Sequence, residues 1–423
     1  MRDKKILIIG GGVTGLFTAF YLIKKGFSVS IIDDGPVPGL HSCSSGNAGL
    51  IVPSHFVPIA NKGTLKEGFL GTLTPGSAFG INGRGNPGLI RWLARFFRNS
   101  FSDMIPDKTE TLAELHLESR DLFTKIQASE IPNLSLELTG LLMISSSEKS
   151  FDKERRSAEQ SIRLGIPAEI WSPEKFNTLN AGLDANLAGA VFYPMDGKVN
   201  PFTMLRNLSD WLKANGVTII ENTRITGWDT LKNQIIAAKS DDREFRADEF
   251  IICTGDQSGS IAQLLGCEIP LQPGKGISFD FPNSGPVLSH PALLMDHHVA
   301  ITPYENHTRI ASGFLLGNRN SAISNSRLKR IHQSANRVLP GLKIPPTAPA
   351  NAWAGFRPVS PDGMPIIGRS VKYSNLFTGT GHAMMGISLG PVSGSILSDL
   401  ITGTHLKPSY SRYLAPSRFG NFF

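Results

Sequence analysis

The chain begins with a strand-turn-helix pattern that constrains its fold more than any other stretch. The apolar run Ile6–Ile9 leads directly into a G-x-G-x-x-G turn over residues 10–15. In such a turn Gly10 allows the tight bend, Gly12 lets the backbone approach a pyrophosphate, and Gly15 lets helix and strand pack closely. The amides at the N-terminus of the helix that follows can then bind the phosphates.

A second apolar run, over residues 27–32, ends at Asp33. A carboxylate at the end of the second strand can accept hydrogen bonds from a ribose diol. A glycine-rich turn alone is a weak signal, because such turns also occur as structural elements in other α/β domains. Strand, glycines, helix, strand and terminal acid within one βαβ length together predict a dinucleotide site.

Length and charge narrow the class of protein. A chain of 423 residues suits two domains, or one interleaved pair. Lys and Arg exceed Asp and Glu by 42 − 35 = 7, which favours nucleotides, carboxylate substrates or an acidic membrane surface as partners. No basic run interleaved with aromatics is present, so we expect no nucleic-acid partner. The first strand begins too early for a signal peptide and no apolar run is long enough to span a membrane, so a cytoplasmic location is expected.

The three cysteines, Cys43, Cys253 and Cys267, show no metal-ligand spacing, and no metal site is predicted. The stretch 87–98 has the pattern of a basic, aromatic amphipathic helix. Such a helix can lie on an anionic bilayer, which would place the protein at the inner face of the membrane, or it can simply cover a domain core. Both interpretations are open at this point.

The remaining pattern predicts alternating segments of two domains. A long helix is expected over residues 109–129 and a strand over 134–138. Asn200 as N-cap and Pro201 as the first helical residue predict a helix start. The apolar run 249–255 resembles the opening unit, so the nucleotide-binding domain resumes there. The segment 266–349 is typical of a mostly antiparallel sheet.

Five motifs occur in one order along the chain: the opening glycines, S-G-N-A-G at 45–49, I-C-T-G at 252–255, G-F-R-P-V-S-P-D-G-M-P-I-I-G at 355–368 and T-G-H at 380–382. This order resembles the FAD-dependent amine oxidoreductases of the D-amino-acid oxidase/glycine oxidase superfamily, and within it the bacterial D-amino-acid dehydrogenases. The resemblance covers nearly the whole chain, and the R-P-x-x-P-D-G-x-P-x-I-G block carries most of its specificity.

The resemblance implies an α/β protein, α+β overall, in which a Rossmann-like FAD-binding domain is interleaved with a mostly antiparallel substrate domain. The FAD-binding domain is expected over residues 1–55, 196–262 and 355–423, and the substrate domain over 56–195 and 263–354. The FAD contacts it implies are Gly10, Gly12, Val13, Thr14, Gly15, Asp33, Ser44, Ser45, Asn47, Ala48, Gly49, Ile225, Gly255, Gly381, His382, Gly386 and Ile387.

The family clamps a substrate carboxylate near the flavin, and Arg357 is the residue expected to do so, because a guanidinium binds a carboxylate bidentately. A structural arginine that ties down the loop 358–363 is the alternative. Tyr304 is a second candidate substrate contact, or a core tyrosine, and His382 would lie at the isoalloxazine edge. His55 is a further candidate for the same pocket, although a lone histidine among apolar residues is usually structural. Asp196 and Asp362 are expected to fix turns.

The implied activity is oxidative deamination of small amino acids, D-configured by resemblance, with hydride transfer from the α-carbon to the flavin. Alternatives are a dehydrogenase of a cyclic imino acid such as D-proline or hydroxy-D-proline, and a glycine- or sarcosine-type oxidase. No lysine stands in residues 301–316, where related oxidases carry one, so a quinone or another carrier is expected as electron acceptor. Non-covalent FAD is expected, since Asn47 stands where relatives place a flavin-linking histidine. A tRNA-modifying flavoprotein is the alternative from another class, and the block around Arg357 argues against it.

Overall fold

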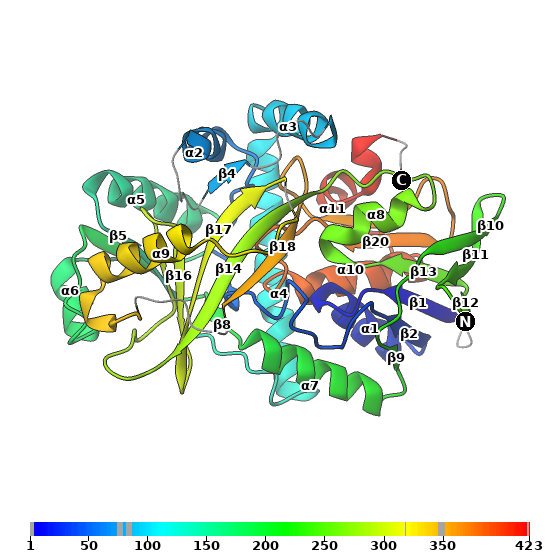
Figure 1. Ribbon diagram of the computed structural model, residues 1–423, viewed down its shortest axis with the longest axis horizontal. Coiled ribbons are helices and arrows are strands. Elements are labelled where there is room, and N and C mark those ends of the chain that lie inside the picture. Colours follow the sequence, from blue (N-terminus) through cyan, green and yellow to red (C-terminus); the bar gives the residue numbers. More distant parts are fainter. Residues whose placement is uncertain (1–3, 74–78, 82–86, 318, 346–351, 421–422) are drawn as a thin grey trace.

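The computed structural model describes residues 4–73, 79–81, 87–317, 319–345, 352–420 and 423. Two large sheets lie side by side, as Figure 1 shows: the N-terminal strands, in blue, belong to one sheet, and long green and yellow strands build the other. The mixture of helix, parallel strands and antiparallel strands confirms the predicted fold class.

The first sheet has six strands. All neighbours are parallel except the outer pair, which is antiparallel. In spatial order the strands are β19 (Ile366–Arg369), β20 (Leu376–Thr380), β13 (Glu249–Ile252), β1 (Lys5–Ile9), β2 (Ser28–Ile32) and β9 (Thr218–Ile220).

Both faces of this sheet are covered, which explains the continuous apolar run of β1. Ile6 and Ile8 pack in one core cluster, and Leu7 and Ile9 pack in another on the opposite face. The helices that contribute to the first cluster are α1 (Val13–Lys24), α4 (Ile105–Ser129), α7 (Pro201–Ala214), α10 (Gly390–Thr402) and α11 (Pro408–Tyr413). The elements that contribute to the second are the antiparallel strands β10 (Gly227–Leu231), β11 (Gln234–Lys239) and β12 (Glu244–Arg246), and helix α8 (Ser258–Gln263).

The second sheet has nine strands and is mostly antiparallel, as predicted; among the described strands only the pairs β5–β15 and β4–β17 are parallel. Its order is β18 (Trp353–Val359), β14 (Gln272–Pro282), β17 (His307–Leu316), β16 (Val299–Pro303), β15 (Ala292–Leu294), β5 (Leu141–Ser145), β7 (Gly189–Tyr193) and β6 (Glu169–Trp171), and β4 (Phe79–Ile81) pairs with β17.

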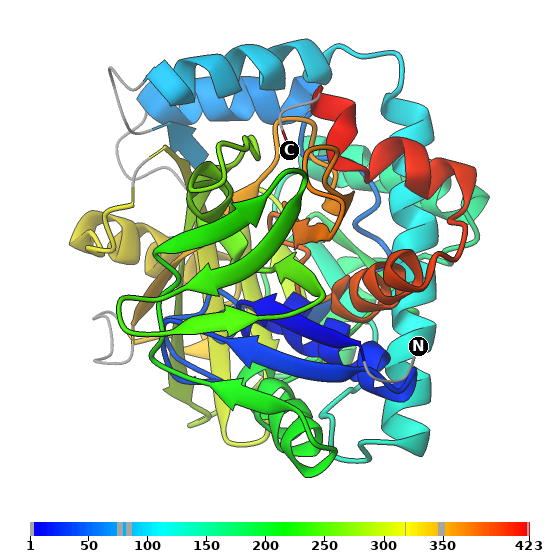
Figure 2. The same ribbon diagram turned by 90° about the vertical axis from the view of Figure 1, so that its right-hand side faces the viewer.

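Helices cover both faces of this sheet as well. Helices α6 (Pro173–Leu179) and α9 (Asn325–Val338) pack on one face, and α5 (Glu148–Arg163) and α4 on the other. Helices α2 (Lys62–Leu73) and α3 (Pro87–Ser100) lie together at the top of Figure 1, and Figure 2 shows α4, in cyan, running along one side of the molecule. No helix in the described part of the chain is long and apolar enough to cross a membrane.

The strand β18 crosses a predicted domain limit. The FAD-binding segment was expected to begin at residue 355, whereas residues 353–359 pair with β14 in the nine-stranded sheet. A short antiparallel pair, β3 (Leu50–Ile51) with β8 (Gly197–Lys198), also joins segments expected in the FAD-binding domain. The predicted division of the chain stays a prediction, and the strand pairings show where the two sheets exchange segments.

Two local expectations met different outcomes. Asn200 caps α7 as predicted, since its Oδ1 accepts the amide of Thr203 at 3.2 Å. The strand predicted over residues 134–138 is wrong: this stretch has a bend at Leu134 and a single bridge at Glu137. The physical reason is Gln127 of α4, whose side-chain amide bonds both the N–H and the C=O of Leu136 and so replaces a neighbouring strand.

Candidate functional site

The glycine-rich turn between β1 and α1 is packed so closely that side chains would not fit. A Cβ on Gly15 would lie 2.0 Å from the carbonyl oxygen of Gly10. Gly10 itself has φ of +107°, and a Cβ there would lie 2.4 Å from the carbonyl oxygen of Cys253. A Cβ on Gly12, by contrast, would meet only hydroxyl oxygens at 3.4 and 3.8 Å. Gly10 and Gly15 therefore hold the turn against the sheet, and the space beside Gly12 is left to a ligand.

A cavity of about 480 Å³ opens in front of this turn. It follows the carboxyl ends of the parallel strands, where ligands bind in open α/β sheets. Ile225 and Arg224 lie in its wall after β9, and Pro358 and Ala383 lie in its wall beside the nine-stranded sheet. The N-terminus of α1 lies against this cavity, and its first turn contains no acidic residue. This arrangement suits the pyrophosphate of a dinucleotide.

Asp33 lies in this cavity directly after β2. Its Oδ2 accepts the amide of Gly11 at 2.7 Å, and its Oδ1 accepts the amide of Gly35 at 3.0 Å and contacts Nε2 of His41 at 3.1 Å. These bonds fix the carboxylate beside the phosphate turn, and each oxygen keeps acceptor capacity for a ribose hydroxyl. Asp34 and His41 lie close enough to Asp33 to form a potential metal-ligand group, but all three line the nucleotide cavity and already have partners there.

The cavity brings together most of the predicted cofactor residues. Those that line it are Gly10, Gly12, Val13, Thr14, Asp33, Ser44, Asn47, Ile225, Gly255, His382, Gly386 and Ile387. Those that do not line it are Gly15, Ser45, Ala48, Gly49 and Gly381. Residues of the cavity that sequence reasoning missed include His41, Ser42, Cys43, Arg224, Thr254 and Asp256. Their only signal in the sequence is their position next to a predicted motif.

The loop 45–49 is held against the nine-stranded sheet. Arg309 of β17 donates to the carbonyl oxygens of Ser45 and Asn47, at 3.3 and 2.9 Å, while it forms an ion pair with Asp280. Thr302 donates to the carbonyl of Ala48 at 2.8 Å. The second sheet thus fixes the main chain of the loop. Asn47 is the residue of this loop that lines the cavity.

Arg357 lies on the face of β18 that looks toward this loop. Its guanidinium covers Gly276, where a Cβ would come within 2.4 Å of it, and its Nη1 donates to the carbonyl of Gly313 at 2.6 Å. No carboxylate pairs with it among the described residues, and burial lowers the pKa of its guanidinium. Cys43, which lines the cavity, is close enough for the charge of Arg357 to act on its thiol, whose pKa burial raises to about 12.

Tyr304 follows β16 and is buried, with burial raising the pKa of its phenol. Its hydroxyl lies 2.9 Å from the carbonyl oxygen of Val199 and 3.3 Å from that of Ala48. The structure therefore places this hydroxyl on main-chain carbonyls behind the loop 45–49.

His382 is anchored to α10. Its Nε2 lies 2.8 Å from Oγ of Ser393, and this hydroxyl donates to the carbonyl oxygen of Leu389 at 2.7 Å. Because Ser393 uses its hydrogen on Leu389, His382 Nε2 is the donor, and burial lowers the pKa of this imidazole to about 4. A neutral imidazole with a proton on Nε2 thus lies in the cavity wall beside the N-terminus of α10.

A buried polar cluster lies behind the site. Asp196 accepts both the amide and the hydroxyl of Ser54, and burial raises the pKa of its carboxyl to about 8. Nδ1 of His55 lies 3.2 Å from the same hydroxyl, and burial lowers the pKa of His55 to about 4. Nδ1 of His116 contacts the hydroxyl of Ser388 at 3.0 Å, next to the cavity residue Ile387. Asp196 therefore fixes the segment after β3, as expected of it.

Comparison with known proteins agrees with this geometry. The family model described as FAD dependent oxidoreductase (DAO) matches residues 5–400. A D-amino acid dehydrogenase of Vibrio vulnificus is 28% identical over 94% of this chain and 96% of its own length. Among solved structures, a glycine oxidase from Bacillus cereus superposes with a TM-score of 0.76 at 21% identity, covering 97% of this chain and 98% of that one.

An L-proline dehydrogenase from P. horikoshii superposes with a TM-score of 0.74 at 20% identity, over 99% of this chain and 98% of that one. At these identities the solved structures show a shared fold, whereas the family model spans almost the whole chain. The cavity along the strand ends, its glycine turn and the match over residues 5–400 lead to one conclusion: the chain belongs to the DAO family of FAD-dependent oxidoreductases.

Proposed function

We propose that this chain is an amino-acid dehydrogenase that oxidises the C–N bond of a small D-amino acid. The observation that carries the proposal is the half-buried guanidinium of Arg357, which has no carboxylate partner among the described residues and lies near Cys43, a residue of the FAD cavity wall. A cation that is partly withdrawn from water and has no counter-ion is unfavourable unless a ligand supplies one. The carboxylate of an amino acid meets that need, and the matched relative is described as a D-amino acid dehydrogenase.

The chain's own residues bind and orient the substrate. Arg357 holds the carboxylate, which directs the α-carbon toward the cavity wall formed by Ala383 and Gly386. FAD, held non-covalently in the cavity, supplies the hydride acceptor. The substrate loses the hydride from its α-carbon and a proton from its nitrogen, and the resulting imine hydrolyses to a 2-oxo acid and ammonia. The N-terminus of α10, at Gly390, provides positive potential near this end of the cavity.

The electron acceptor we propose is a quinone or another carrier. Neither β16 nor β17 contains a lysine. The neighbouring Lys275 of β14 has Nζ on the carbonyl of Ala322, away from the loop 45–49. This arrangement favours a dehydrogenase over the alternative of an oxygen-using glycine- or sarcosine-type oxidase. The alternative substrate is a cyclic imino acid, D-proline or hydroxy-D-proline. The size of the substrate side chain that the site accepts would decide between it and a linear D-amino acid.

A quinone acceptor resides in a membrane, and α3 has a face suited to one. Its buried residues include Leu89, Trp92 and Phe96, which pack inward, while Ile90 and Phe97 are 62% and 55% exposed. Exposed arginines flank these two side chains. We propose that this face rests on an anionic bilayer surface.

Anaerobic reduction tests the main proposal. The yellow FAD-loaded protein is mixed under argon with a panel of D- and L-amino acids, with D-proline and with glycine, and the loss of flavin absorbance is followed. We expect bleaching by D-amino acids and little peroxide on admission of air. If no amino or imino acid bleaches the protein, the proposal is wrong; rapid peroxide formation would establish the oxidase alternative instead.

A further inference from the structure

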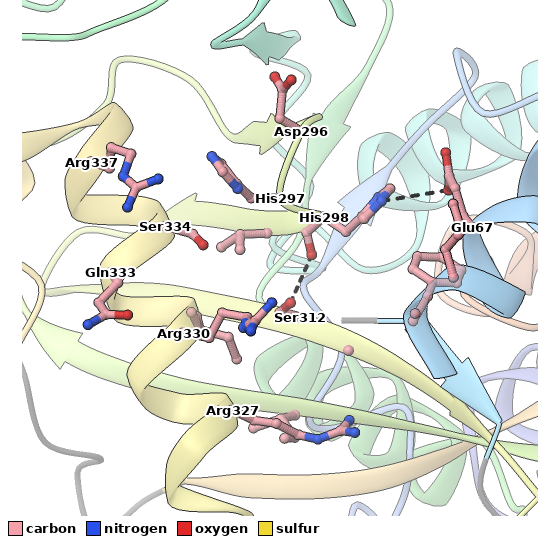
Figure 3. Close-up of a pocket in the computed structure, with 17 residues that line it drawn as sticks. Glu67, Asp296, His297, His298, Ser312, Arg327, Arg330, Gln333, Ser334 and Arg337 are labelled. Carbon is pink, nitrogen blue, oxygen red and sulfur yellow. Dashed lines mark hydrogen bonds and ion pairs between the residues drawn. The ribbon is translucent and has the colours of Figure 1, made fainter. Parts of the chain in front are cut away.

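A second cavity lies in the substrate half of the molecule and is not part of the FAD site. It has a volume of about 570 Å³ and is bounded by α9, by the turn 295–298 between β15 and β16, by β17 and by the end of α2 (Figure 3). Ile277 of β14 lines it and packs with Ile331 of α9, whereas the next residue, Ser278, donates to the carbonyl of Gly46 in the FAD loop. Because strand residues alternate between faces, the two cavities lie on opposite faces of the same sheet.

Three arginines of α9 enter this cavity: Arg327, Arg330 and Arg337. Figure 3 shows the side chains of Arg327 and Arg330 extending from the helix toward the strands. The side chain of Arg337 lies on the same side, farther along the helix from Arg330. None of the three has an ion-pair partner among the described residues. Lys275 adds a fourth positive charge nearby, and burial together with the charge of Arg327 lowers its pKa.

The acidic residues of the cavity are already engaged. Asp296 accepts the amide of Ser146 at 2.8 Å and the hydroxyl of Ser147 at 2.5 Å. Glu67 lies 3.6 Å from Lys153 and 3.6 Å from Nε2 of the cavity histidine His298. Neither carboxylate forms an ion pair with an arginine of α9, and three arginines against two carboxylates leave the lining with a net positive charge.

One atom of Arg327 lacks a partner among the described residues. Nη1 of Arg327 is buried and has no hydrogen-bond partner within the part of the chain that the structure describes. A charged donor that is removed from water and left without an acceptor is unfavourable, and in folded proteins such a group calls for a ligand or another explanation. Arg327 also lines a cavity large enough for a metabolite, and a guanidinium with one nitrogen lacking an acceptor at such a place is suited to bind an anion.

We propose that this cavity binds a small anion with two or more carboxylate or phosphate groups, separately from FAD and from the amino-acid substrate. Arg327, which is half-buried, supplies the inner contact, and the exposed Arg330 and Arg337 supply the outer ones. Hydrogen-bond donors at the imidazole of His297 and at the hydroxyl of Ser334 complete the lining. The three arginines lie at successive positions along α9, so a single acid group cannot contact all of them. A ligand with two or more acid groups can.

Calorimetric titration of the FAD-loaded protein tests this site without reference to activity. Citrate serves as the carboxylate probe and pyrophosphate as the phosphate probe. The probe that binds more tightly identifies which acid group the site prefers. We expect saturable binding of at least one probe, and a loss of affinity of about tenfold or more in Arg330→Gln/Arg337→Gln, which changes only exposed side chains. The matched control is Arg206→Gln/Lys213→Gln on α7, which removes the same charge elsewhere and is expected to bind as the parent does.

Arg327→Gln separates a binding arginine from a structural one. For a binding arginine we expect an unliganded melting temperature equal to or above that of the parent, because the orphaned donor is gone, and no rise in melting temperature on addition of the anion. A lowered melting temperature with the ligand-induced rise intact would assign Arg327 to the fold and overturn the proposal. Absence of binding by both probes, or unchanged affinity in Arg330→Gln/Arg337→Gln, would also overturn it.

Discussion

Nη1 of Arg357 donates a hydrogen bond to the carbonyl oxygen of Gly313 at 2.6 Å. This bond depends on a break in the ladder between β14 and β17, where Gly313 takes φ of +90° and the register shifts between Lys275 and Ile277. The bulge turns a strand carbonyl toward Arg357 and holds one side of the guanidinium flat over Gly276. Its other donors are left for a ligand on the FAD side of the sheet.

Arg357→Lys tests the carboxylate clamp. Lysine keeps the charge and loses the bidentate geometry, so we expect KM for the amino acid to rise about 10²- to 10³-fold, since each charge-assisted hydrogen bond contributes about 1.5–3 kcal/mol. The FAD content should equal that of the parent, because Arg357 does not line the nucleotide cavity. The control substrate is the corresponding amine without a carboxylate, whose oxidation should change little. An unchanged KM would show that Arg357 only ties the strand to the bulge.

Asp33→Asn tests the ribose end of the cavity. The variant keeps one acceptor oxygen, but it loses the negative charge and the second oxygen, which together accept the N–H groups of Gly11 and Gly35. We therefore expect the dissociation constant of FAD to rise about 10- to 100-fold. Quenching of FAD fluorescence on titration with the apoprotein measures it. Asp34→Asn is the matched control, because Asp34 lines the same cavity but pairs with Arg224 at 3.2 Å. Equal losses in the two variants would contradict the assigned role of Asp33.

The glycine turn, Asp33 and the cap at Asn200 were predictable because each depends on residues within one local unit. The prediction failed where a distant residue decides the conformation. Leu134, Leu136 and Leu138 alternate as in a strand, yet Gln127 takes the main-chain bonds of Leu136 and no strand forms.

The helix α9 was missed within a segment expected to be antiparallel sheet. Its buried residues Leu328, Ile331, Ala335 and Val338 follow helical spacing, so the signal was present in the sequence. Tyr304 is different in kind. The partners of its hydroxyl, Val199 and Ala48, lie 105 and 256 residues away, and no local pattern could show that contact.

Asp196 predicts a pH dependence of stability. Its carboxyl releases a proton near pH 3.8 in the unfolded chain and near pH 8 in the folded one, because burial disfavours the charge. The folded state therefore holds the extra proton between these values, and the stability that it contributes is complete below about pH 4 and is lost as pH rises toward 8.

Asp196→Asn removes this loss. The side-chain carbonyl of asparagine can still accept from Ser54 and carries no charge at any of these pH values, so we expect the variant to gain stability relative to the parent as pH rises from 4 to 8, by a few kcal/mol at about 1.4 kcal/mol per pKa unit. Urea unfolding at several pH values measures the difference. Asp210→Asn, at an exposed position on α7, should instead give a curve parallel to that of the parent. Parallel curves for both variants would mean that Asp196 is ionised in the folded protein.

Charge reversal on α3 tests the membrane contact. Arg91 and Arg98 are exposed beside Ile90 and Phe97, whereas Arg95 is engaged with Glu268 at 2.8 Å and is left unchanged. With vesicles that contain anionic lipid, we expect the parent to float and Arg91→Glu/Arg98→Glu to remain in the lower fractions. The reason is that each basic residue near such a surface contributes about 1 kcal/mol of attraction.

The control for this experiment is Arg206→Glu/Lys213→Glu on α7, which changes the net charge by the same amount on a different helix. It should float as the parent does, and neither variant should alter anaerobic reduction of the flavin, because α3 and α7 contribute no residue to the FAD cavity. If both variants fail to float, the vesicles attract the whole protein through its net charge. If both variants still float, the contact lies on another surface.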